Sequence, residues 1–371
     1  MDLLSSKYII DGVQMSLTPG QMLRGCMAEP PVEAEGDQET LADESQDPAP
    51  DKHSYDEKKA MQYAQKVEAL PKRQFPIAFA GSYTVGKAAQ ALIDAIWCSG
   101  HFRLGDLSLK ADWKWNGRSI GLPAAFYSSV EAACGYMDAL GIGLEKYTLT
   151  AGEPAVGFKA VTAAGEADED LPEEESLLRD LPYRTVNPRF SRRRKVSATL
   201  QAEASDWLLY IPFDPCDFRL GGSALAQALG TSPSTAPDIQ DADYFMDCFE
   251  VVRELVEDGV VKAGATVGDG GLLCALRAMA SGTGAEVSIG DISKAYGGEK
   301  PVRVLFGEVP GVLIQIADID YDYVDAELIL QDVVYYPIGH PAPGRNGVSI
   351  SEKADLPQIL ESLLNTLEGE D

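Results

Sequence analysis

The chain has 371 residues, of which 45% are hydrophobic and 24% are charged, and its formal net charge is −27. This length predicts two domains, and the composition is that of a globular protein rather than a disordered chain. The negative charge excludes general binding to nucleic acid, because phosphate backbones require a basic surface. No run approaches the ~18 apolar residues of a membrane span. Residues 1–4 lack the basic start of a signal peptide.

The first part of the chain predicts a short strand at 8–10 and a turn at Pro19-Gly20. Residues 27–53 are acidic, contain prolines and have few large apolar side chains. Such a composition cannot bury enough surface to offset its ordering entropy, so we expect a flexible segment. Regular structure resumes with a helix over 55–70.

A glycine-rich motif follows the apolar run 75–80, which predicts a strand. From Gly81 to Lys87 the sequence matches the Gly-x-x-x-x-Gly-Lys part of a phosphate-binding P-loop. The next residue is Ala88, where a P-loop needs a Ser or Thr hydroxyl for magnesium. No apolar strand ending in a magnesium-binding Asp follows at a suitable place. A P-loop NTPase therefore stays open only as a less favoured alternative.

The middle of the chain predicts a helix over 127–140 and then a second acidic, proline-containing stretch over 163–182. A basic run follows at 192–195, which is more often a solvated patch than a phosphate site. We interpret 163–194 as a connection between two domains.

The second half of the chain alternates strand and helix patterns. The clearest helix spans 241–259, with Asp241 as N-cap and Gly259 as the C-terminal stop. The acidic run 318–325 lacks the spacing of a calcium loop and predicts a solvated edge or turn. The other predicted elements are strands at 196–200, 207–212, 302–306, 312–316 and 333–338, and a closing helix at 356–367.

The stretch 264–280 contains an acidic residue before two glycines and then an apolar helix. Leu272, Leu273, Leu276 and Met279 recur at spacings of three and four, so one helix face is buried. Gly270 and Gly271 leave the first N–H groups of that helix uncovered, and such a terminus attracts anions. A simple glycine turn into a core helix is the other interpretation.

Three segments carry a family resemblance. Gly268-Asp269-Gly270-Gly271-Leu272 fits a Ser-Asp-Gly-Gly-Leu turn, with Gly268 in place of the serine. The run 220–227 is similar to a Leu-Gly-x-Ser/Thr helix start, and the run 305–312 resembles Phe-x-Glu-x-x-Gly before a strand. In this order the three resemble the aminoimidazole ribonucleotide synthetase-related (PurM-like) family, and most closely the second synthetase-like half of phosphoribosylformylglycinamidine synthase.

The resemblance extends over 75–162 and 196–345. Residues 85–96 fit a helix of the family, and Gly105-Asp106 with the run 107–113 resembles its Gly-Asp and Leu-Ser-Ala-Asn-Trp, with Asp112 replacing asparagine. Where the family has Gly-Lys-Asp-Ser, this chain has Gly152-Glu153-Pro154-Ala155. A surface turn between strands is the favoured interpretation there.

The resemblance implies an α+β, two-domain PurM-like architecture, in which a smaller mixed-sheet domain precedes a larger sheet domain flanked by helices. The predicted divisions are an N-terminal segment 1–53, domains 54–162 and 195–371, and the linker 163–194. The implied ligands are ATP or ADP with magnesium, the metal being held by Asp269 and Glu308. In the rival account, Asp269 only caps its own helix. The implied nucleotide-binding residues are Gly86, Lys87, Asp106, Asp112, Gly221, Gly222, Ser223, Asp269, Gly270 and Gly271.

The resemblance implies ATP-dependent amidation of formylglycinamide ribonucleotide in purine biosynthesis, as part of a complex. The departures at Gly268, Asp112, Glu153 and Pro154 weaken the electrostatics on which phosphoryl transfer depends. The second hypothesis is therefore a non-catalytic paralogue that binds a nucleotide or serves assembly. The family buries one face of the smaller sheet in a shared barrel, so we also expect an exposed apolar sheet face, and a homodimer or pairing with a related synthetase-like chain.

The two acidic, proline-containing stretches generate the first prediction. Limited proteolysis is expected to cut first within 27–53 and 163–182, because these stretches lack the apolar periodicity of the segments around them. The cleavage sites are identified by mass spectrometry of the earliest fragments. Early cleavage within 241–259 would show that the domains are misplaced.

Overall fold

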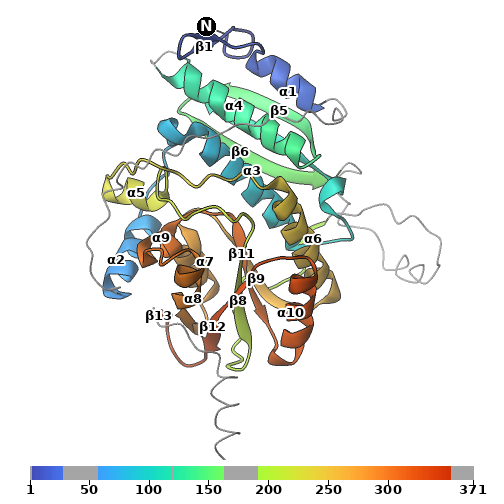
Figure 1. Cartoon of the computed structure of the whole chain (residues 1–371), viewed down its shortest axis with the longest axis vertical. Coiled ribbons are helices and arrows are strands. Elements are labelled where there is room, and N and C mark those ends of the chain that lie inside the picture. Colours follow the sequence, from blue (N-terminus) through green and yellow to red (C-terminus); the bar gives the residue numbers. More distant parts are fainter. Residues whose placement is uncertain (1, 28–56, 118–120, 163–190, 352–371) are drawn as a thin grey trace, which may run out of the picture.

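The computed structural model describes residues 2–27, 57–117, 121–162 and 191–351. The flexible segment predicted at 27–53 lies outside the described residues from 28 onward, as do the one predicted at 163–182 and the closing helix at 356–367. The chain forms two main sheets, which Figure 1 shows one above the other, each with helices packed against it.

The N-terminal region begins with a small hairpin of β1 (Ile9–Ile10) and β2 (Val13–Gln14), followed by α1 (Pro19–Met27) and α2 (Glu57–Glu68). The strand at 8–10 and the helix at 55–70 are confirmed. The turn at Pro19-Gly20 was wrong, because α1 begins there. A proline is well suited to the first helical position, since the N–H it lacks has no partner within the helix.

The smaller sheet has three strands in the order β5 (Gly143–Ala151), β4 (Leu107–Trp115) and β6 (Ala155–Thr162). β4 is parallel to β5 and antiparallel to β6, so the sheet is mixed, as expected. Residues 152–154 form the predicted turn between strands. One face packs on the core with α3 (Ala80–Ile96) and α4 (Leu122–Ala139), and Leu109, Ala111 and Trp113 are buried there.

The other face of this sheet is polar. It carries the alternate residues of β4, namely Ser108, Lys110, Asp112 and Lys114, and their neighbours on β5 and β6. The expectation of an exposed apolar sheet face was therefore wrong. Its source was the buried shared barrel of the resembling family, whereas the alternation along β4 already places lysines on this side.

The strand predicted at 75–80, and the P-loop with it, were also wrong. The 3₁₀ turn η1 (Ile77–Phe79) leads directly into α3, so the residues from Gly81 to Lys87 lie inside a helix and cannot form a phosphate-cradling loop. Close helix packing explains the small residues. A Cβ on Gly81 would lie 3.3 Å from the Cβ of Ala132 on α4. Thr84 and Ser129 join the same two helices by a hydroxyl hydrogen bond of 2.7 Å.

The larger sheet has six strands in the order β13 (Val348–Ser351), β10 (Gly284–Ser288), β12 (Tyr336–Ala342), β8 (Trp207–Pro212), β11 (Gly311–Ile316) and β9 (Val261–Val267). Neighbouring strands are antiparallel except β10 and β13. Helices cover both faces. Figure 1 shows α7 (Gly271–Met279), α8 (Gly290–Ala295) and α9 (Pro301–Phe306) on one side, and α6 (Ala242–Asp258) and α10 (Tyr321–Leu330) on the other.

The sequence patterns of this half were confirmed where local signals were strong. β8 and α6 match their predicted positions, with Asp241 accepting a hydrogen bond from the Tyr244 N–H and Gly259 left-handed at φ +80°. α7 and β11 were also confirmed, and β12 overlaps the strand predicted at 333–338. α5 (Ala224–Leu229) begins at the predicted helix start.

Three other patterns in this half were misread. Residues 196–200 form no strand, and the preceding strand is β7 (Ser191–Arg194), paired with β3 (Cys98–Ser99). Residues 302–306 are helical, because Pro301 starts α9 and packing against α7 outweighs strand propensity. The acidic run 318–325, predicted as a solvated edge or turn, forms the 3₁₀ turn η4 (Asp318–Asp320) and then the start of the helix α10, which was not predicted. Among the helices of the described residues, none has the length and apolar content that crossing a membrane requires.

Arg253 of α6 connects the two parts of the molecule. Its side chain is fully buried and donates hydrogen bonds to the backbone carbonyls of Ile96, the last residue of α3, and of Cys98 and Gly100 just after it. Its guanidinium carbon lies 4.1 Å from the ring centre of Phe102. These contacts fix the end of α3 against the larger sheet, and α3 carries one wall of the candidate site.

Replacement of Arg253 generates the second prediction. Arg253→Met is expected to lower the free energy of unfolding by about 3 kcal/mol, because it leaves several buried carbonyls without donors. Glu254→Met, an exposed neighbour on the same helix, is the matched control and is expected to change it by less than about 0.5 kcal/mol. Urea unfolding followed by circular dichroism measures both. Equal effects of the two substitutions would contradict a stabilising role for the hydrogen bonds between Arg253 and the backbone at the end of α3.

Candidate functional site

A small pocket lies where α3 meets the loops at the edge of the larger sheet. Its cavity volume is about 30 Å³, which holds about two water molecules. α3 contributes one wall, and the opposite walls come from the loop before α5, the turn before α7 and the segment after α9. The lining residues include Arg73, Tyr83, Gly86, Lys87, Gln90, Gly221, Gly222, Asp269 and Glu308.

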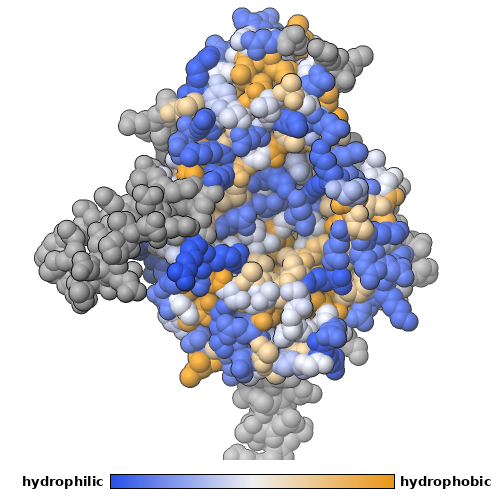
Figure 2. Space-filling model, turned by 180° about the vertical axis from the view of Figure 1, so that it is seen from behind, coloured by the Kyte–Doolittle hydropathy of each residue, from blue (hydrophilic) through white to orange (hydrophobic). Residues whose placement is uncertain are grey.

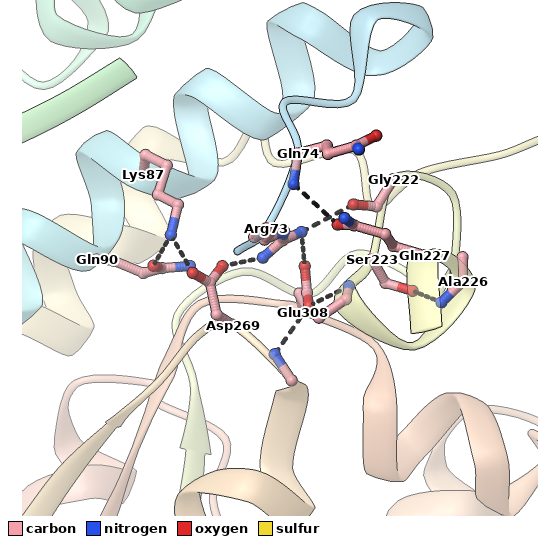
Figure 3. Close-up of polar contacts among 12 residues, drawn as sticks. Arg73, Gln74, Lys87, Gln90, Gly222, Ser223, Ala226, Gln227, Asp269 and Glu308 are labelled. Atoms are coloured by element: carbon pink, nitrogen blue, oxygen red, sulfur yellow. Dashed lines mark hydrogen bonds and ion pairs between the residues drawn. The ribbon is translucent and has the colours of Figure 1, made fainter. Parts of the chain in front are cut away.

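Arg73 lies at the centre of this site, on the segment between α2 and η1. One guanidinium nitrogen donates to Asp269, and the other donates to Glu308 and, at 2.8 Å, to the carbonyl of Gly222 (Figure 3). Its side chain is only 13% exposed. Burial acts to lower the pKa of Arg73, but Glu308 and Asp269 outweigh it and hold the pKa above its ordinary value. Arg73 is therefore a permanent cation between two carboxylates.

Lys87 adds a second cation to the same cluster. From α3 its ammonium group binds the other carboxylate oxygen of Asp269 and lies 3.4 Å from Gln90 Oε1 (Figure 3). The ring of Tyr83, one turn earlier on α3, lies under both cations, with its centre 4.7 Å from the Arg73 guanidinium carbon. Burial raises the pKa of Tyr83 to about 12, so its phenol stays neutral. The cluster thus contains two cations and two carboxylates.

Glu308 is the buried anion of the cluster, with a side chain 11% exposed. Its Oε1 accepts the backbone N–H of Ala224 at 2.9 Å and that of Gly270 at 2.8 Å. These N–H groups belong to the two helix starts that were predicted to present free donors to phosphate. In the structure, a carboxylate of the chain already accepts hydrogen bonds from both. Burial raises the pKa of Glu308, whereas Arg73 opposes that shift.

The glycines at the turn before α7 allow this close approach. Gly270 and Gly271 both have left-handed backbones, at φ +81° and +68°. A Cβ on Gly271 would lie 2.7 Å from the Leu305 carbonyl oxygen, so no larger residue fits against the end of α9. Gly268, which replaces the serine of the resembling family, faces Gln90. A Cβ there would lie 2.6 Å from the Gln90 side chain.

The structure brings most of the predicted site residues together. Gly86, Lys87, Gly221, Gly222, Asp269 and Glu308 line the pocket, and Gly270 is bonded to Glu308. Ser223 is the N-cap of α5 and accepts the Ala226 N–H at 3.2 Å. Asp106 and Asp112 do not line the pocket, since Asp106 accepts the Arg103 N–H and Asp112 binds Thr148.

Sequence reasoning missed Arg73, the residue on which the cluster is centred. It stands after Pro71, in a stretch interpreted only as the end of a helix. The only available signal was a basic pair, Lys72-Arg73, just before an apolar run. The glycine motif that ends at Lys87 was compared with a P-loop. Lys87 does reach the site, but from the helix α3 rather than from a loop.

A magnesium ion does not fit Asp269 and Glu308 as they are arranged. Both carboxylates are already neutralised by Arg73 and Lys87, and one oxygen of Glu308 accepts two backbone N–H groups. Within the described ranges, no group of three or more His, Cys, Asp or Glu side chains is placed to hold a metal. The rival account of Asp269 as a helix cap also fails, because α7 has no side-chain cap.

Comparison with known proteins shows which sequences this chain is similar to. The family model for the AIR synthase related protein, C-terminal domain, matches residues 206–349. A probable phosphoribosylformylglycinamidine synthase (chloroplastic/mitochondrial) of Arabidopsis thaliana is 27% identical over 252 residues, covering 68% of this chain and 17% of the relative. That of Homo sapiens is 27% identical over 221 residues, covering 58% of this chain and 15% of the relative. This chain is thus similar in sequence to phosphoribosylformylglycinamidine synthases, and its residues 206–349 match an AIR synthase related C-terminal domain.

Solved structures show that the α+β fold of this chain is shared with PurL of Thermotoga maritima. T. maritima PurL complexed with FGAR has a TM-score of 0.51 and 12% identity, covering 76% of this chain and 42% of that chain. PurLQS from Thermotoga maritima has a TM-score of 0.50 and 11% identity, covering 77% and 42%. This chain thus spans less than a fifth of the length of the two synthases above and less than half of the length of these two structures.

Replacement of Glu308 generates the third prediction. Glu308→Ala is expected to lower the free energy of unfolding by about 3–5 kcal/mol, because it leaves Arg73 without its buried partner. Glu308→Gln keeps an acceptor for the Ala224 and Gly270 N–H groups, so its effect is expected to be smaller. Chemical unfolding measures both variants, with exposed Glu203→Ala as control. A loss with Glu308→Ala no larger than with the control would contradict a structural ion pair.

Proposed function

We propose that this phosphoribosylformylglycinamidine synthase relative is a non-catalytic assembly protein, whose nucleotide site has been replaced by internal ion pairs. The observation that carries the proposal is the position of Arg73 between Asp269 and Glu308. The Arg73 guanidinium and the Lys87 ammonium bind the two carboxylates that were predicted to hold magnesium. They therefore occupy the space that a metal ion and a phosphate would need.

The electrostatics of ligase chemistry support this proposal. ATP-dependent amidation needs a metal ion and free positive groups that stabilise charge as phosphate is transferred. Here the cations are already paired with carboxylates of the same chain, and the helix-start donors are bonded to Glu308. The cavity of about 30 Å³ is also far smaller than the ~300 Å³ or more of a typical small-molecule site. Binding of ATP or ADP would therefore require Arg73 to leave the carboxylates.

The comparisons favour a second candidate function. The named relatives are synthases, and one solved structure with the same fold contains FGAR. On this account the chain contributes to the ATP-dependent amidation of formylglycinamide ribonucleotide in purine biosynthesis, with ATP or ADP and magnesium bound after Arg73 moves aside. The T. maritima structure named PurLQS supports assembly into a complex under either account. Both candidate functions are compatible with a cytoplasmic location and with a linker between two domains at 163–194.

Removal of Arg73 generates the fourth prediction and tests the proposal. For the wild type we expect no binding heat with about 1 mM ATP or ADP and magnesium, because Asp269 and Glu308 are neutralised. Arg73→Ala is expected to melt at a lower temperature than the wild type without metal and to gain a magnesium-dependent rise in melting temperature, because metal then binds the freed carboxylates. Calorimetry and thermal melting measure these effects.

Lys72→Ala is the matched control, because Lys72 is the neighbouring cation and its side chain pairs with the exposed Glu153 outside the cluster. It is expected to behave as the wild type. The decisive assay mixes the wild type with formylglycinamide ribonucleotide, ATP, magnesium and ammonia and measures release of phosphate. Turnover, or magnesium-dependent nucleotide binding by the wild type, would overturn the non-catalytic proposal in favour of the synthase.

A further inference from the structure

The helix α10 presents a second apolar face to solvent. Its inner face carries Val324 and Leu328, which are fully buried in the core. The other side carries Tyr323, Ala326 and Leu330, which follow one another at spacings of three and four residues and are all exposed. Residues spaced in this way lie on one side of a helix. α10 therefore has one apolar face more than the core of this chain uses.

The apolar side chains beside this face are exposed to an unusual degree. Ile319, just before α10, is 88% exposed, and Leu330 and Ile329 at the end of the helix are 74% and 61% exposed. Half of the exposed large apolar side chains of the described residues lie between Ile319 and Val334. Figure 1 shows α10 in the lower part of the molecule, and Figure 2, the view from behind, shows a mostly hydrophilic surface with apolar groups in separate patches. Apolar side chains gathered in this way mark a contact surface, whereas single ones do not.

Carboxylates surround this apolar face. The stretch 318–334 contains five aspartates and one glutamate and has no lysine or arginine. At 100° per residue, Asp322 lies on one side of the stripe formed by residues 323, 326 and 330, and Glu327 lies on the other. Two of the remaining carboxylates accept hydrogen bonds from aromatic side chains, Asp318 from Trp207 and Asp325 from Tyr335. Among the described residues, no ion pair with a lysine or arginine neutralises any of the six.

The helix dipole accounts for only part of this charge. Asp322 lies in the first turn of α10, where a carboxylate is favourable. Glu327 lies in the second half of the helix and Asp332 follows its C-terminal end, where a carboxylate meets the negative end of the dipole. The acidic rim is therefore not explained by the stability of α10 alone.

The charge of the rim decides between the occupants that an apolar helix face could take. A two-fold contact with a second copy would place the acidic rim against itself. The apolar run 356–367 of this chain, which lies outside the described residues, contains Glu361 and is followed by further carboxylates, so it would add to the repulsion. A membrane surface with anionic lipids is repelled for the same reason. The rim instead requires a partner that brings cations.

We infer that the exposed face of α10 is a docking surface for a basic amphipathic helix of another protein. The apolar side chains of that helix cover the stripe, and its lysines or arginines pair with Asp322 and Glu327 on either side. The 10 residues of α10 extend over about 15 Å, which matches about three turns of a partner helix. The inference gives the proposed assembly role a surface and a class of partner. It does not depend on the pocket at Arg73, so nucleotide binding there would leave it standing.

The fifth prediction tests this surface with the full chain and a defined probe, a fluorescently labelled peptide of leucine and lysine patterned as an amphipathic helix of about four turns. The same peptide with glutamate in place of lysine is the second probe. Fluorescence anisotropy at about 0.15 M ionic strength measures the affinities. Circular dichroism confirms that every variant is folded, as expected for substitutions of exposed side chains.

Two variants separate the apolar stripe from its acidic rim, and each has a matched control of exposed residues elsewhere. The stripe variant carries Ile319→Gln, Ile329→Gln and Leu330→Gln, and its control carries Ile9→Gln, Val13→Gln and Leu17→Gln. The rim variant carries Asp322→Asn and Glu327→Gln, and its control carries Asp291→Asn and Glu203→Gln, which give the same change in net charge.

We expect the wild type to bind the lysine peptide and not the glutamate peptide. The stripe variant is expected to bind the lysine peptide about tenfold more weakly, the rim variant about fivefold more weakly, and both controls within about twofold of the wild type. Equal binding by the wild type and the stripe variant, including none by either, would overturn the inference. An equal loss in the rim variant and its control would also overturn it, because the peptide would then follow only the net charge.

Two further measurements cover the other occupants. Tighter peptide binding by a full-length Leu360→Gln, Leu363→Gln variant than by the wild type would assign the face to the C-terminal segment of the same chain. A wild-type dimer in sedimentation that is lost only in the stripe variant would assign it to a second copy. Either result would overturn the inference and leave the calorimetry of the Arg73 pocket unaffected.

Discussion

The pairing of Arg73 with Glu308 and Asp269 is the interaction on which the site depends. It joins the segment after α2 to the turn before α7 and to the segment after α9, and Glu308 in turn joins the starts of α5 and α7. A buried ion pair contributes little net stability when compared with apolar residues of the same shape. Loss of one partner is costly, however, because the other charge then remains buried. The cluster therefore acts as a constraint, since its members can be replaced together but not singly.

Two structural features hold α3 where this cluster requires it. The small residues at its start allow close packing against α4, and Arg253 holds its end against α6 through three backbone carbonyls. With both ends fixed, Lys87 and Tyr83 face the turn before α7. The glycines of that turn then bring Gly270 within hydrogen-bond distance of Glu308. The geometry of the site follows from this packing rather than from a phosphate-binding loop.

The sequence predicted those elements whose signals are local. The cap and stop of α6, at Asp241 and Gly259, lie next to the apolar stripe they delimit and were placed correctly. The apolar runs at 75–80 and 302–306 were read as strands, because their helical or turn conformation depends on neighbours such as α4 and α7. Asp269 and Glu308 were expected to meet because both lie in motifs. Arg73 was missed because its partners stand 196 and 235 residues later in the chain.

At the pocket, charge is balanced within the chain. Each cation faces a carboxylate of the same chain, so the site presents little net charge to an incoming anion. An internal ion cluster of this kind takes the place of a charged ligand, because an anion that binds there must first displace a carboxylate from its buried cation. The arrangement thus favours a structural role of the cluster over nucleotide chemistry at the pocket.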